Sequence, residues 1–126
     1  MTQVVGSPTA ATLVDSGLLA RVGGDRALLA EVIELFLEDG PMMVEQIRKG
    51  LADGDTAAVR MAAHSLAGTA ANFDADELTT LARALETHAR ADDIAESRKA
   101  FARLVSAVRQ VLDRLTVIHT ALQCAS

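Results

Sequence analysis

The stretch DTAAVRMAAHSLAGTAAN, residues 55–72, decides the fold of this 126-residue chain. It contains no proline, and its apolar residues recur at the spacing of an amphipathic helix. The residues on that apolar face are Val59, Ala62, Ala63, Leu66 and Ala70. At roughly 100° per residue, His64 points about 160° away from the centre of this face. The pattern therefore predicts a helix that packs one face into a core and presents His64 to solvent.

The predicted face around His64 lacks most of the charged side chains that an exposed helix surface usually carries. Arg60 and Gly68 lie one turn before and one turn after the histidine. The rest of the patch is made of small residues: Ala57, Ala67 and Ala71. This composition indicates a contact surface around an imidazole, which is able to act as a nucleophile near neutral pH. The alternative is close packing of another helix, which a glycine at position 68 also permits.

Helix-capping and helix-breaking residues around this stretch predict further helices. Asp55 is suited to cap the helix of His64, and Asp25 to cap a long helix that ends at Gly54. Inside that long segment, Gly40-Pro41 predicts a kink or a short break, because proline removes a backbone donor. Before it, a short amphipathic helix is expected over residues 12–22. Met42 and Met43 are expected in the core, with the border of a docking surface as the alternative.

Two more helices are predicted after the helix of His64. Asp74 and Glu77 have the spacing of a capping box, with Asp in place of the usual Ser or Thr. Asp92 or Asp93 caps the last helix. Four long helices with short connections favour an all-α fold, an antiparallel up-down four-helix bundle with a short extra N-terminal helix. Because one chain supplies all four long helices, we expect a monomer.

The expected boundaries divide the chain into three parts. Residues 1–11 are predicted to form a flexible N-terminal tail or linker, residues 12–120 the bundle, and residues 121–126 a C-terminal tail. His119 is expected in the frayed end of the last helix. The acidic run Glu34, Glu38 and Asp39 is interpreted as a solvated face.

Composition excludes several functional classes. Half of the residues are apolar but only three are aromatic, all Phe, which suits helix packing better than a sheet sandwich. A net charge of −5 without a Lys/Arg cluster argues against nucleic-acid binding. No apolar run has the length of a membrane span, and the N-terminus lacks the pattern of a signal peptide. With a single cysteine, Cys124, and no internal disulfide, we expect a cytoplasmic protein without direct membrane contact.

Residues 63–73, AHSLAGTAANF, resemble the signature of the histidine-containing phosphotransfer (HPt) domain family: histidine, any residue, leucine, usually lysine, then glycine. The similarity extends over roughly residues 18–115 and includes VGGDRALLAEVIELFLEDGP and the turn LADGD. It implies a four-helix bundle that carries phosphoryl groups between response-regulator receiver domains in a two-component phosphorelay. By position, it implies that His64 is the phosphoacceptor and that Gly68 keeps the imidazole uncovered. It is compatible with the C-terminal module of a hybrid sensor kinase, whose parent would tether it to the inner membrane.

The chain departs from the family pattern at two positions. Ala67 stands where the family frequently has lysine, and Asp74 stands where a glycine is frequent. We interpret Asp74 as a helix cap. The missing cation would be replaced by Arg60 on the same face or by Arg83 from the neighbouring helix. The predicted docking surface around the phosphoacceptor therefore consists of Arg60, Ala67, Gly68, Ala71 and Arg83.

The expected chemistry needs no cofactor on this chain. The neutral imidazole would take a phosphoryl group from a receiver aspartate and pass it to another receiver, with Mg²⁺ held by the receiver. No glycine-rich phosphate loop is present, so the chain is predicted to be a phosphotransfer intermediate without ATP binding or kinase activity. His88 and His119 lack metal-ligand spacing to His64, and no metal site is predicted.

Three other functions are weighed against phosphotransfer. A protein-docking bundle with weak or lost transfer is favoured by Ala67 in place of lysine. An enzyme is disfavoured because no acid, oxyanion donor or metal set accompanies the histidine. The dimerisation and histidine domain of a sensor kinase typically has an acidic residue directly after its histidine, where this chain has Ser65.

Overall fold

The computed structural model describes residues 17–124, and the regular structure within that range is helical. The helices are α2 (Gly17–Arg21), α3 (Arg26–Asp53), α4 (Thr56–Ala71), α5 (Asp76–Arg90) and α6 (Ile94–Cys124). The predicted all-α class is confirmed, and α2 corresponds to the short N-terminal helix. The start of that predicted helix and the predicted tail over residues 1–11 lie outside the described residues.

Three predicted caps begin the long helices α3, α4 and α6. Asp25, Asp55 and Asp93 each accept a hydrogen bond from the backbone amide three residues further on, at 3.0 or 3.1 Å. A cap of this kind satisfies one of the donors that a helix start leaves without a partner. Gly54 ends α3 in a left-handed conformation, with φ of 70°. These capping residues therefore determine where the three helices begin, and Gly54 determines where α3 ends.

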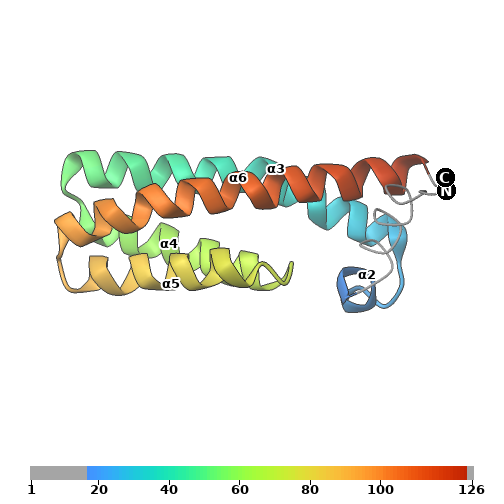
Figure 1. The fold of residues 1–126 in the computed structure, drawn as a ribbon, viewed down its shortest axis with the longest axis horizontal. Helices are drawn as coiled ribbons and strands as arrows, with labels where there is room; N and C mark the ends of the chain where they lie inside the picture. Colours follow the sequence, from blue (N-terminus) through green and yellow to red (C-terminus); the bar gives the residue numbers. More distant parts are fainter. Residues whose placement is uncertain (1–16, 125–126) are drawn as a thin grey trace, which may run out of the picture.

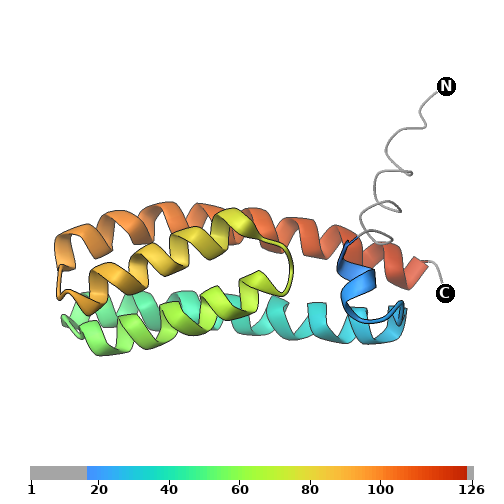
Figure 2. The ribbon, with the colours of Figure 1, turned by 90° about the horizontal axis from the view of Figure 1, so that it is seen from below.

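Each of the four long helices packs against two of the others. α4 contacts α3 and α5, and α6 contacts α3 and α5, which closes a ring around a shared core. The chain reverses direction at each connection between them, and α3 and α6 extend past the ends of α4 and α5 toward α2 (Figures 1 and 2). None of the helices within residues 17–124 combines the length and the apolar character that crossing a membrane requires.

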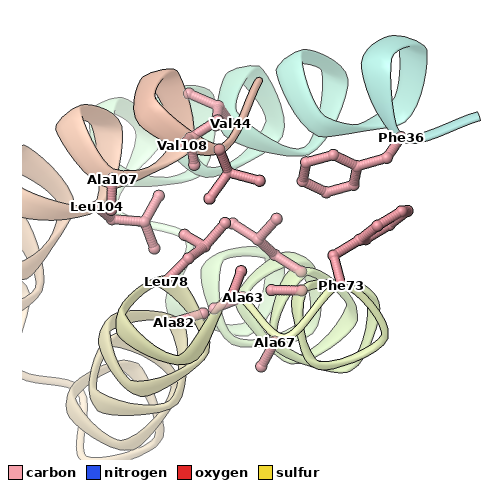
Figure 3. Packing of buried hydrophobic residues seen from close by; sticks show 14 of the residues in the cluster. Phe36, Val44, Ala63, Ala67, Phe73, Leu78, Ala82, Leu104, Ala107 and Val108 are labelled. Atoms are coloured by element: carbon pink, nitrogen blue, oxygen red, sulfur yellow. The ribbon is translucent and has the colours of Figure 1, made fainter. Parts of the chain in front are cut away.

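The core is built from aliphatic side chains and alanine. The ring centroids of Phe36 on α3 and Phe73 after α4 lie 5.3 Å apart with the ring planes tilted by 45°, and Figure 3 shows the two rings next to one another. From α4 come Ala63 and Ala67, and from α5 comes Ala82, all of them buried. Small side chains let helix backbones approach closely, so α4 and α5 pack tightly and place their surface residues side by side.

The short break expected at Gly40-Pro41 is absent, because α3 is helical from residue 26 to residue 53 with Pro41 inside it. Packing of α3 against α4 and α6 holds the helix together across the missing proline donor. Gly40 fits close to a neighbouring aromatic ring. A Cβ atom at this position would lie 3.2 Å from the ring of Phe36. Of the two methionines expected in the core, Met43 is half-buried but Met42 is exposed.

The capping role expected of Asp74 is wrong. Helix α5 begins at Asp76, and its N-cap is Ala75, which makes no side-chain cap hydrogen bond. Asp74 instead adopts φ of 55°, in the left-handed region where glycine is favoured and Asp is tolerated. Its carboxylate forms an ion pair with Arg21 of α2. The turn after α4 thus needs a left-handed residue at position 74.

The predicted C-terminal tail starts too early. Helix α6 continues through Cys124, and only residues 125–126 of that tail lie outside the described residues. The extension is held by burial of Leu122 in the core. His119 is part of this ordered helix and not of a frayed end, because its Nε2 lies 2.8 Å from Oε2 of Glu34 on α3.

Candidate functional site

His64 lies on α4 with its side chain 75% exposed. The two neighbouring positions toward the core, Ala63 and Leu66, are completely buried. The exposure predicted from the helical spacing is therefore confirmed. The cap at Asp55 and the small residues of α4 fix the backbone from which the imidazole projects.

The histidine lies at the edge of the open face of α4, next to α5. On one side of it, Met61, Ser65 and Gly68 are exposed. On the other side, Ala67 is only 3% exposed, so its predicted place on an open docking surface is wrong. The reason is that α4 packs against α5 as well as against α3, and this buries a second side of the helix. A helical wheel with a single apolar face does not show this second contact.

Glu86 of α5 orients the imidazole. Its Oε2 lies 2.9 Å from Nδ1 of His64, and its side chain is only 12% exposed. An ionised carboxylate is only an acceptor, so Nδ1 carries the proton in this hydrogen bond. In the neutral ring, Nε2 then keeps its lone pair. The geometry thus presents Nε2 as the nucleophilic nitrogen.

Arg90 completes this arrangement from the next turn of α5. Its Nη2 donates a hydrogen bond of 3.0 Å to the same Oε2 of Glu86. The shared oxygen places one carboxylate between an imidazole and a guanidinium, which holds the Glu86 side chain in position. Neither Glu86 nor Arg90 was identified from the sequence. Their spacing of four residues on α5 signals a pair, but only the register between α4 and α5 connects that pair to His64.

The two arginines predicted beside the histidine occupy different surroundings. Arg60 on α4 is half-buried and Arg83 on α5 is exposed. Within residues 17–124, neither forms a hydrogen bond or an ion pair with His64. The guanidinium that the structure ties to the histidine, through Glu86, is that of Arg90.

Gly68 has no packing role within the described part of the chain. A Cβ atom built at this position would meet no heavy atom within 4 Å. Close packing of another helix of residues 17–124 therefore does not explain the glycine. Ala71, one turn further along α4, is half-buried. The surface beside the imidazole is open at Gly68, where the sequence predicts that a partner approaches.

Other histidines and acidic side chains do not extend the site. Within residues 17–124, no group of three or more His, Cys, Asp or Glu side chains is placed to hold a metal ion. His88 is half-buried on α5, as a residue at the border of an apolar stripe should be. His119 pairs with Glu34, whereas His64 pairs with Glu86.

Comparison with protein-family models gives one decisive match. Residues 31–117, more than half of the chain, match the model of the Hpt domain. The chain belongs to the Hpt domain family. Comparisons with curated proteins and with solved structures give no significant match. Hpt domains take part in phosphorelay signalling of two-component systems as phosphotransfer intermediates, not kinases, and interact with response-regulator receiver domains.

Proposed function

We propose that His64 of this Hpt domain accepts a phosphoryl group from the aspartate of one receiver domain and passes it to another. The observation that carries the proposal is an exposed imidazole whose Nδ1 is held by Glu86 and whose surroundings at Gly68 are open. The antiparallel up-down four-helix bundle expected from the sequence is the rigid frame of this proposal, and the closed ring of helix contacts supports it.

In the proposed transfer step, no proton has to move. The lone pair of His64 Nε2 attacks the phosphorus of the aspartyl-phosphate, and the bond from phosphorus to the aspartate oxygen breaks. The aspartate leaves as a carboxylate, and the ring, which keeps its proton on Nδ1, becomes positively charged. The carboxylate of Glu86, 2.9 Å from Nδ1, stabilises that charge. Attack by the aspartate of a second receiver reverses these events.

The negative charge of the transferring group needs cations as well as positioning. Arg90 is linked to the imidazole by two hydrogen bonds that share the carboxylate of Glu86, and we propose that it compensates for the lysine that Ala67 replaces. Arg60 and Arg83 are further candidates for the phosphoryl oxygens. The Mg²⁺ that such transfers use is assigned to the receiver domain, and no cofactor is assigned to this chain. These cations favour phosphotransfer over a docking bundle that has lost its chemistry.

The test is transfer from isotopically labelled phosphorylated receiver domains to the purified chain. The wild-type chain should acquire a label that is acid-labile and base-stable. His64→Gln should acquire none, whereas His88→Gln, the same change at a half-buried histidine of α5, should be labelled like the wild type. A label that persists in His64→Gln would contradict the proposal. So would the absence of label on the wild-type chain from a panel of active receivers.

A further inference from the structure

Helix α6 carries a cluster of exposed cations in its first half. Of the 12 Lys and Arg residues of the chain, four lie within residues 98–109: Arg98, Lys99, Arg103 and Arg109. All four are exposed, and residues 97–112 contain no Asp or Glu. At roughly 100° per residue, the four side chains lie within about 140° of one another, on the side of α6 opposite its buried residues. We call these four residues the α6 basic face.

The three arginines of the α6 basic face have no carboxylate partner in the described part of the chain. Lys99 forms an ion pair with Glu96, in which Nζ and Oε2 lie 3.1 Å apart. Arg98 donates a hydrogen bond of 3.2 Å to a backbone carbonyl of α3, which is a neutral acceptor. Arg103 and Arg109 form neither a hydrogen bond nor an ion pair with any described residue. A chain whose net charge is −5 therefore keeps three positive charges on this face that folding does not neutralise.

Helix stability does not account for this arrangement of charges. Lys99 and Arg103 are four residues apart on the exposed side of α6, and like charges at this spacing destabilise a helix. The exposed residues at the centre of the face, Ala102 and Ser106, have small side chains, so another chain can approach the helix closely. The α6 basic face therefore has the charge and the shape of a contact surface for an anionic partner.

The α6 basic face lies away from the transfer site. α6 is diagonally opposite α4 in the ring of four long helices, because each of the two packs against α3 and α5 (Figures 1 and 2). The exposed side of α6 therefore points away from His64. Within residues 97–112, no large apolar side chain is exposed, and the exposed one on this helix is Val117, beyond the face. Charge, and not apolar burial, is what the face offers.

We propose that the α6 basic face binds an acidic helix of another protein. The four cations extend over 11 residues, about 16 Å, so a helix of about three turns with Asp or Glu along one side matches their length. Three of the four are arginines, whose planar guanidinium groups bind carboxylates through paired hydrogen bonds. A lipid surface is a poorer occupant, because the face has no large apolar side chain to insert. A nucleic acid is poorer too, because the net charge of −5 repels it. The inference goes beyond phosphotransfer and does not rest on His64.

The first experiment measures binding of a fluorescent, alanine-based helical peptide with glutamates along one side. A peptide of the same composition, with the glutamates distributed around the helix, is the control for non-specific attraction between opposite charges. The patterned peptide should bind at least about tenfold more tightly than the control peptide. Its binding should weaken as salt rises from about 0.05 M to about 0.5 M, because ion pairs at a surface are screened by salt. Equal binding of the two peptides would overturn the proposal.

Matched variants locate the binding site. Arg103→Glu should lower the affinity for the patterned peptide about tenfold or more, because it places a negative charge in the middle of the α6 basic face. Lys49→Glu, the same change of charge at an exposed lysine of α3, should leave the affinity within about threefold of wild type. Equal losses in the two variants would mean that the peptide responds only to net charge, and would overturn the proposal.

Thermal melting distinguishes a contact surface from a structural one. Arg103→Glu should melt at the temperature of wild type or above it, because an opposite charge replaces a like charge four residues after Lys99. A melting temperature clearly below that of wild type would show that Arg103 serves the fold, and would overturn the proposal.

Three further readouts separate the proposed occupant from the other possible ones. Sedimentation with vesicles that contain about 30% phosphatidylserine should show no binding that Arg103→Glu abolishes; such binding would make a lipid surface the occupant and overturn the proposal. Analytical ultracentrifugation should show no dimer that Arg103→Glu abolishes; such a dimer would make a second copy of this chain the occupant, with the same consequence. Arg103→Glu should also transfer phosphoryl groups at the wild-type rate. A loss of transfer in that variant would show that the face belongs to the receiver contact, and a separate partner would be ruled out.

Discussion

Among the four bundle helices, the shorter pair, α4 and α5, and the longer pair, α3 and α6, contribute different things. α4 and α5 have 16 and 15 residues, and their buried side chains are largely alanine. α3 and α6 have 28 and 31 residues and bury larger side chains such as Ile33, Phe36, Leu104 and Ile118. The close packing of the shorter pair brings His64 and Glu86 into contact. The longer pair provides most of the large apolar side chains of the core. Changes in the shorter pair should therefore affect transfer, and changes in the longer pair should affect stability.

Leu115→Ala in α6 should have the largest effect on stability. Leu115 is completely buried, and replacing such a leucine by alanine costs about 2–5 kcal/mol through lost burial and a residual cavity. Denaturation by urea, followed by circular dichroism, measures the loss. Per folded molecule, the rate of phosphotransfer should be unchanged. A slower transfer by the folded variant would mean that the longer pair also shapes the transfer site.

Gly68→Gln should have the largest effect on transfer apart from loss of the histidine itself. A long side chain beside the imidazole would keep the receiver from reaching His64, and a misplacement of about 1 Å can cost about a hundredfold in rate. Transfer kinetics from a phosphorylated receiver measure this, while circular dichroism should show an intact fold.

Gly68→Ala is the matched control for that variant. Its Cβ atom meets nothing within 4 Å, so transfer should stay within about twofold of wild type. Because alanine is the better helix former, the free energy of unfolding should rise by about 1 kcal/mol. A transfer loss as large as that of Gly68→Gln would show that even a methyl group blocks the partner.

Glu86→Ala should have a smaller effect on transfer. Without the carboxylate, the imidazole loses the hydrogen bond that fixes its tautomer and orientation, which costs about 1 kcal/mol or about fivefold in rate. Glu86→Gln retains an acceptor oxygen for Nδ1, and its loss should be smaller than that of Glu86→Ala. The rates of phosphotransfer of the two variants are compared with that of the wild type. Equal rates in wild type and Glu86→Ala would contradict the proposal that Glu86 of α5 orients the imidazole.

The smallest effect is expected where the turn after α4 meets α2. The hydrogen bond from Arg21 lowers the pKa of Asp74 below its ordinary value of 3.8. Because the folded pKa is the lower one, this pair stabilises the fold above that value, and the stabilisation is lost as the pH falls through the folded pKa. Arg21→Gln should therefore have a slightly lower melting temperature than wild type at pH near 7, and the difference should shrink as the pH falls below 3.8. A melting difference that is constant with pH would contradict this origin.

Much of the fold and the centre of the site could be predicted from the sequence, because both depend on local patterns. Asp25 and Asp55 start their helices through contacts three residues away, and the spacing of apolar residues exposes His64. The remaining features depend on how distant segments meet. Burial of Ala67 and the contact of Glu86 with His64 need the register of α4 against α5, which no short stretch of sequence contains.

The left-handed Asp74 and the length of α6 were missed for the same reason. The partner of Asp74 is Arg21, 53 residues earlier in the chain, so the Asp-Glu spacing that suggested a cap gives no information about it. The last turns of α6 are held by burial of Leu122 in the core that distant segments build, although they look like a tail in the sequence.

The most direct test of the account is to determine which atom carries phosphorus in the phosphorylated chain. Long-range ¹H–¹⁵N and ³¹P nuclear magnetic resonance spectra of the isotopically labelled protein distinguish the two ring nitrogens of His64. The account predicts phosphorus on Nε2, with the proton retained on Nδ1 opposite Glu86. Phosphorus on Nδ1, or on a residue other than His64, would contradict it.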